Sequence, residues 1–136
     1  MKRSEIVEVL ADNSFFQGLN ASHLDLLAGC AAEAHFRKGD YIFRDGRPSD
    51  EFHLIRQGEV ALEIYIPGKG PFVIQKVGAN MVLGWTWIVA PYRKQYDAVA
   101  VKPVKALAFD GKRLRMACDE DPRFGCELLK RFTGIM

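Results

Sequence analysis

Residues 36–46 read FRKGDYIFRDG and residues 51–60 read EFHLIRQGEV, and these two stretches decide the fold. The triplet at 38–40 suits a turn, because glycine accepts positive φ and an aspartate side chain can bond its own backbone. Tyr41–Phe43 is aromatic and β-branched, which favours a strand. After a polar break, residues 51–56 alternate, and Gln57-Gly58 indicates a tight reversal. The pattern predicts short antiparallel strands joined by turns.

The same alternation continues outward along the chain. Between Val60 and Ile66 the apolar residues occupy every second position, which predicts a strand with one face in a core. Residues 67–70 are the predicted hairpin tip and 72–77 the return strand, while 96–102 and 104–109 are the last two strands. The sequence therefore predicts a mainly β fold with flanking helices, an antiparallel double-stranded β roll of jelly-roll type.

Apolar residues at helical spacing mark both ends of the chain. Residues 4–12 are a predicted helix, and Asn20 caps a second one that ends near Ala32. Asp110 caps a third helix, and residues 123–132 form a fourth after a proline break. We expect one domain over 1–136, with N-terminal helices over 1–33, a β roll over 34–109 and C-terminal helices over 110–136.

Composition narrows the function classes. The chain has 136 residues and a net charge of +2, with charges of both signs interspersed, so a nucleic-acid surface is not expected. No apolar run reaches the ~18 residues of a membrane helix, and we expect no membrane partner. The three cysteines are not spaced as in a metal site or a disulfide framework, and we expect reduced thiols, which suit a cytoplasmic protein. No pattern of catalytic residues is present, and we expect no enzyme and no metal site.

The stretch over residues 36–60 resembles the opening strands of the cyclic-nucleotide-binding domain family. The order of helices, β roll and helices is similar to that of the family along nearly the whole chain. The resemblance implies a regulatory domain of the Crp-like type, common in bacterial proteins. Related transcription factors carry a helix-turn-helix after the roll, and the sequence ends at Met136, so we expect no nucleic-acid binding by that route.

The resemblance also implies where a ligand would bind. Family members hold the cyclic phosphate with backbone N–H groups and an arginine, and the ribose with a glutamate, in a segment like Phe-Gly-Glu-x-Ala-Leu followed by Arg-x-Ala. Here Gly84 is kept, Trp85 stands at the glutamate position and Gln95 at the arginine position. The nucleotide cassette is therefore degenerate, and we expect no cAMP or cGMP cofactor bound in the usual way. The candidate pocket residues are Leu83, Gly84, Trp85, Thr86, Trp87, Arg93, Lys94, Gln95 and Tyr96.

Three functional readings stay open for this cassette. Arg93 or Lys94 could supply a substitute cation for a cyclic nucleotide. Alternatively, Trp85 and Trp87 could stack on a different flat small molecule, or fill the space as core. The third reading is a ligand-free module that binds a protein partner.

Self-association is a related expectation. The last predicted helix carries an apolar stripe that either folds back on the roll or pairs with a second copy. We favour a homodimer through the C-terminal helices. The stripe consists of Phe124, Leu128, Leu129 and Phe132.

Overall fold

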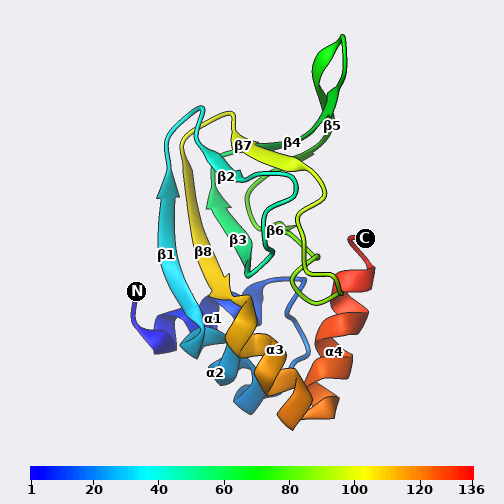
Figure 1. Ribbon diagram of the computed structural model, residues 1–136. Helices are drawn as coiled ribbons and strands as arrows, with labels where there is room; N and C mark the ends of the chain where they lie inside the picture. Colours follow the sequence, from blue (N-terminus) through cyan, green and yellow to red (C-terminus); the bar gives the residue numbers. More distant parts are fainter.

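The computed structural model describes all 136 residues and contains four helices and eight strands. Two helices precede the strands and two follow them (Figure 1). In chain order the elements are α1 (Arg3–Asp12), α2 (Ala21–Gly29), β1 (Ala31–Phe36), β2 (Tyr41–Phe43), β3 (Glu51–Gln57), β4 (Val60–Ile66), β5 (Gly70–Val77), β6 (Val82–Leu83), β7 (Asp97–Ala100), β8 (Val104–Asp110), α3 (Gly111–Glu120) and α4 (Pro122–Thr133).

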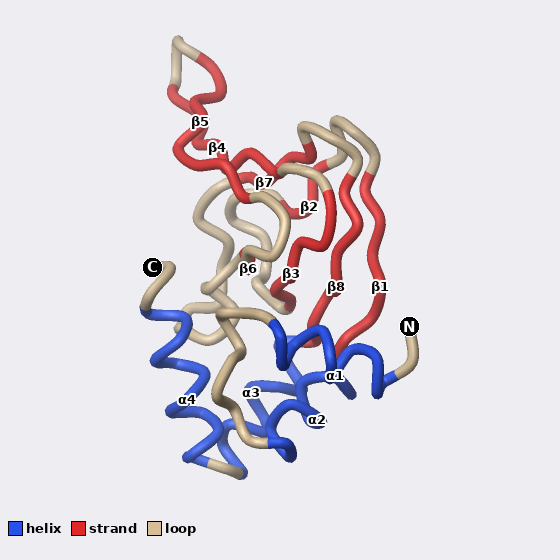
Figure 2. The backbone as a smooth tube through the Cα atoms, turned by 180° about the vertical axis from the view of Figure 1, so that it is seen from behind, coloured by secondary structure: helices blue, strands red, loops and turns tan.

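The strands form two four-stranded antiparallel sheets, which confirms the predicted β roll. One sheet has the order β1-β8-β3-β6 and the other β2-β7-β4-β5. Neighbouring strands of a sheet are mostly distant in sequence, as a roll requires. All four helices gather at one end of the roll (Figure 2).

The hairpin β4–β5 differs from the expectation that one whole face of β4 lies in a core. Val60, Ala61 and Leu62 are buried, whereas Ile64 and Tyr65 are exposed. The register shifts between Leu62 and Glu63, and beyond this bulge the hairpin extends away from the body (Figure 1). The alternation of apolar residues predicted a strand here. It could not predict that no second layer covers the outer half of this strand, beyond the bulge.

The first strand begins earlier than predicted. We expected helix up to about Ala32, but α2 ends at Gly29 and β1 begins at Ala31. Ala31 pairs with Phe109 and Ala32 with Ala108 across the sheet. Alanine favours helix by itself, so tertiary pairing with β8 overrides local propensity here. The caps predicted at Asn20 and Asp110 do form, since Asn20 accepts a hydrogen bond from the His23 amide and Asp110 accepts one from the Arg113 amide. Ser4 does not cap α1, which begins one residue earlier, at Arg3, without a side-chain cap.

The C-terminal stripe folds back on its own domain. Phe124, Leu128 and Phe132 are fully buried in the main core with helices α1 and α2, while Leu129 is 43% exposed. Three of the four stripe residues therefore belong to the core of a single chain, and the homodimer through the C-terminal helices stays a prediction. No helix of the structure has both the length and the apolar character to cross a membrane.

Candidate functional site

Part of the cassette lines a cavity of about 240 Å³, called the cassette chamber below. β4, β5 and β6 form its walls, and the loop after α1 and the end of the chain also contribute to it. Thirteen residues line it: Ser14, Phe15, Leu62, Gln75, Val77, Asn80, Met81, Val82, Leu83, Gly84, Trp85, Tyr96 and Ile135. The structure thus brings together four of the predicted residues, namely Leu83, Gly84, Trp85 and Tyr96.

The cassette chamber contains no charged side chain. Trp85 and Tyr96 supply aromatic surface, and both are half-buried. Burial raises the pKa of the Tyr96 hydroxyl, against an opposing effect of the Trp85 side chain, so this group stays protonated and can donate a hydrogen bond. The chamber is suited chemically to a small uncharged molecule with a flat apolar face.

The two positions that the resemblance assigns to nucleotide binding differ in their surroundings. Trp85, at the glutamate position, lies in the chamber wall and leaves the cavity open. Gln95, at the arginine position, is exposed and lies outside the lining. No helix begins between Gly84 and β7. In this segment the Ile88 amide donates to the Trp85 carbonyl at 3.3 Å, which closes a turn. The structure therefore has no helix start after Gly84 that would direct its first N–H groups at a phosphate.

Thr86 and Trp87 belong to the body of the protein. The Thr86 hydroxyl donates to the Ser49 hydroxyl at 2.7 Å, and both side chains are buried. Trp87 is completely buried and stacks on Phe52 with 5.0 Å between ring centroids. Its carbonyl accepts a 2.6 Å hydrogen bond from Arg115 of α3, which fixes this loop to the helix.

The two predicted substitute cations also lie outside the cassette chamber. Arg93 is exposed and donates to the Gly46 carbonyl at 3.4 Å. Lys94 is 5% exposed and donates to the Glu51 carbonyl at 3.0 Å, and its Nζ atom lies 3.3 Å from the position of an added Cβ atom at Gly84. Neither Arg93 nor Lys94 is among the residues that line the cassette chamber, so their role as substitute cations stays a prediction.

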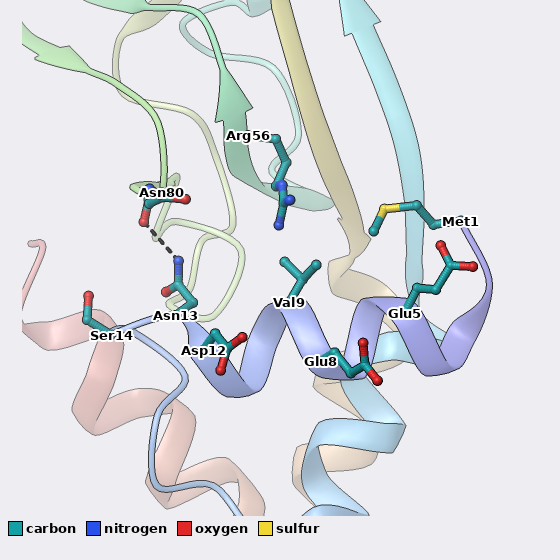
Figure 3. Close-up of a pocket in the computed structure, with 9 residues that line it drawn as sticks. All are labelled: Met1, Glu5, Glu8, Val9, Asp12, Asn13, Ser14, Arg56 and Asn80. Atoms are coloured by element: carbon teal, nitrogen blue, oxygen red, sulfur yellow. Dashed lines mark hydrogen bonds between the residues drawn. The ribbon is translucent and has the colours of Figure 1, made fainter.

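A larger and more open cavity of about 700 Å³ lies between α1 and the edge of the roll. Figure 3 shows three carboxylates of α1 along it, with Arg56 reaching from β3 toward the helix. The Asn13 side chain donates to the Asn80 carbonyl at 3.0 Å at one end. The structure contains no group of three or more His, Cys, Asp or Glu side chains placed to hold a metal ion.

Sequence reasoning missed most of the chamber walls. Leu62 and Val77 could have been found, because both are inward-facing residues of the predicted hairpin. Phe15 and Ile135 had no local signal, since they come from segments far away in the sequence. Phe15 also packs edge-on against Phe132 at 4.8 Å, which connects the chamber wall to α4.

Comparison with known proteins agrees with this architecture. The family model of the cyclic nucleotide-binding domain matches residues 33–121. A CRP-like cAMP-activated global transcriptional regulator of Mycobacterium tuberculosis is 25% identical over 123 residues, covering 90% of this chain and 55% of the regulator. The chain thus spans about half the length of the curated relatives it matches.

Solved structures show the same fold. A candidate cyclic nucleotide-binding protein of Geobacter metallireducens superimposes with a TM-score of 0.84 at 25% identity, covering 93% of this chain and 92% of that one. The cAMP-bound regulatory domain of Toxoplasma gondii PKA gives a TM-score of 0.80 at 19% identity, covering 98% and 50%. Together with the match over residues 33–121, these likenesses show that the chain belongs to the cyclic nucleotide-binding domain family.

Proposed function

We propose that this chain is a non-catalytic, ligand-sensing regulatory domain that binds a small uncharged molecule and does not bind cAMP or cGMP in the usual way. The observation that carries the proposal is the lining of the cassette chamber, which has aromatic walls and no charged side chain. A cyclic nucleotide is a phosphate monoanion, and desolvating it without a counter-charge is costly. The three cysteines are all unpaired, which fits the cytoplasmic location that we propose.

The expected loss of nucleotide affinity can be estimated. Each charge-assisted hydrogen bond contributes about 1.5–3 kcal/mol. Replacing a carboxylate by Trp85 and a guanidinium by Gln95 removes two such bonds, which weakens binding by roughly two to four decades. A domain that would bind a cyclic nucleotide at micromolar concentration would then need millimolar concentrations.

Calorimetry with cAMP and cGMP tests the first part of the proposal. We expect no dissociation constant below ~100 μM for either nucleotide. The double change Trp85→Glu with Gln95→Arg restores both groups at the family's spacing and should create measurable cAMP binding. A matched control is Trp85→Glu with Gln57→Arg, which adds the same charges but places the guanidinium on an exposed residue of β3. Low-micromolar binding of either nucleotide by the unmodified protein contradicts the proposal.

Uncharged probes test the second part. Adenosine and indole offer a flat face without a phosphate, and Trp85 in the chamber wall provides a fluorescence signal. A probe that binds only the folded state raises the free energy of unfolding by about 2.7 kcal/mol at about 100 times its dissociation constant. We expect saturable stabilisation that Tyr96→Ala weakens. If neither probe binds while the protein is folded, the chamber is not a site for flat uncharged molecules.

A second candidate function, binding of a protein partner, has one observation in its favour. β5 is the edge strand of its sheet and exposes Phe72, Val73 and Ile74 to solvent. An exposed apolar edge strand can pair with another chain, including a second copy of this one. Light scattering of the unmodified protein and of Ile74→Lys distinguishes the two functions, because only a hairpin interface is lost in the variant.

A further inference from the structure

A second cavity of about 430 Å³ lies beside the cassette chamber and is called the Lys94 chamber here. It is bounded by β2, by the loop over residues 44–50 and by the start of β3. Its floor holds two buried polar side chains, Lys94 at 5% exposed and His53 at 4% exposed. The two chambers share no lining residue, and they approach each other at Gly84, where an added Cβ atom would lie 3.3 Å from the Lys94 Nζ atom.

The Lys94 ammonium has an incomplete set of partners. It donates one hydrogen bond, to the Glu51 carbonyl at 3.0 Å, although an ammonium has three donors. It also lies 4.1 Å from the centre of the Phe43 ring, and it forms no ion pair with a carboxylate. A buried cation without a counter-charge is unfavourable, and burial lowers the pKa of Lys94 to about 8, against the opposing effect of Glu51 and Asp50.

His53 adds a second unpartnered group to the same floor. Its Nδ1 atom is buried and has no hydrogen-bond partner. Burial and the charge of Lys94 lower the pKa of His53 to about 4, so the ring is neutral near neutral pH. A neutral imidazole carries one N–H donor, which a ligand in the chamber can use.

The rim of the Lys94 chamber is also basic. Arg44 and Arg47 line it, both exposed, and Arg44 donates to Asp97 at 3.3 Å. Of the two rim carboxylates, Asp50 is already engaged by Arg115 at 3.1 Å and by Lys112 at 3.7 Å. Glu51 is exposed to solvent, where water and salt screen its charge.

We propose that the Lys94 chamber is a binding site for a small oxyanion of the phosphate, sulfate or carboxylate kind, with the Lys94 ammonium as its buried counter-charge. The anion accepts hydrogen bonds from the free donors of Lys94, and the His53 ring and the Arg47 guanidinium contribute further donors. This site is separate from the cassette chamber and does not depend on what binds there.

Sulfate titrations at constant ionic strength, with chloride as the balancing salt, test the site through the unfolding temperature. We expect sulfate to stabilise the unmodified protein, and Lys94→Met to weaken its binding about tenfold to a hundredfold. The matched control is Lys69→Met, which removes the same charge at the exposed hairpin tip and should leave the response unchanged. Phosphate and acetate, titrated in the same way, show which oxyanion shape the site prefers.

The pH dependence of sulfate binding gives a second test. Sulfate keeps its charge between about pH 6.5 and about pH 9, whereas Lys94 loses its proton as the pH rises through about 8. Binding should therefore weaken at the higher pH, and Lys94→Arg, which stays charged, should remove this dependence.

If Lys94→Met does not fold, Arg47→Met is the second variant and should weaken binding about threefold or more. Equal sulfate affinity in Lys94→Met or at both pH values means an adventitious ion only and overturns the proposal.

Discussion

Phe132→Ala tests whether α4 is an integral part of the domain. Phe132 is completely buried, and its ring meets three aromatic rings edge-on at centroid distances of 4.8, 5.0 and 5.2 Å, those of Phe15, Phe52 and Trp87. Truncating a buried phenylalanine costs about 3–5 kcal/mol, and each edge-on pair accounts for about 0.5–1.5 kcal/mol beyond burial. We expect a loss near the upper end of this range.

Urea denaturation followed by circular dichroism measures this loss. The stability of a domain is about 5–15 kcal/mol, so the variant should unfold at a much lower urea concentration. Leu129→Ala is the control on the same helix, because Leu129 is 43% exposed, and it should cost less than about 1 kcal/mol. A loss below about 1 kcal/mol for Phe132→Ala would refute the packing of α4 described above.

Two further predictions concern the roll. Folding lowers the pKa of His53 from 6.5 to about 4. Between these pH values the unfolded protein binds a proton at His53 and the folded protein does not, so the free energy of unfolding falls by about 1.4 kcal/mol per pH unit on acidification. His53→Phe should remove that share of the loss in urea titrations between these pH values, while replacing the exposed His35 by Phe should keep it. Gly58→Ala should cost about 2–4 kcal/mol, because Gly58 has φ +98° and an added Cβ would lie 2.2 Å from the Pro103 carbonyl oxygen. Gly68→Ala is the control at similar φ with no neighbour within 4 Å, and equal costs for the two variants would show that the contact with Pro103 is unimportant.

Local patterns predicted the fold well because the strands here are short and marked by turns. The reversal at Gly58 and the cap at Asp110 lie where the sequence indicated them. The start of β1 was not predictable, since Ala31 adopts a strand only through pairing with β8. The exposed outer half of β4–β5 was equally hidden, because periodicity records that residues alternate and not whether a second layer covers them.

The site was less predictable than the fold. The sequence placed Trp85 and Lys94 in one candidate pocket, but in the structure they line two different cavities. The spacing of residues along the sequence could not predict this separation. The segment over 84–94 is a loop, and hydrogen bonds with Ser49 and Arg115 fix its position. Side-chain directions in loops follow from such tertiary contacts and not from spacing.

The edge strand β5 has a consequence for how this protein behaves at high concentration. Pro71 lacks an N–H donor, the bulge at the middle of the hairpin interrupts regular pairing, and the Lys76 charge lies next to the exposed apolar residues. These three features obstruct the growth of one continuous sheet through many molecules, although a single partner strand can still pair with the exposed residues. The three features contribute little to the core, because Pro71, Lys76 and the bulged residue Ile74 are exposed. Solubility and folding stability are therefore controlled by different parts of the same strand, and a variant that loses Pro71 or Lys76 can unfold normally in urea and still form filaments.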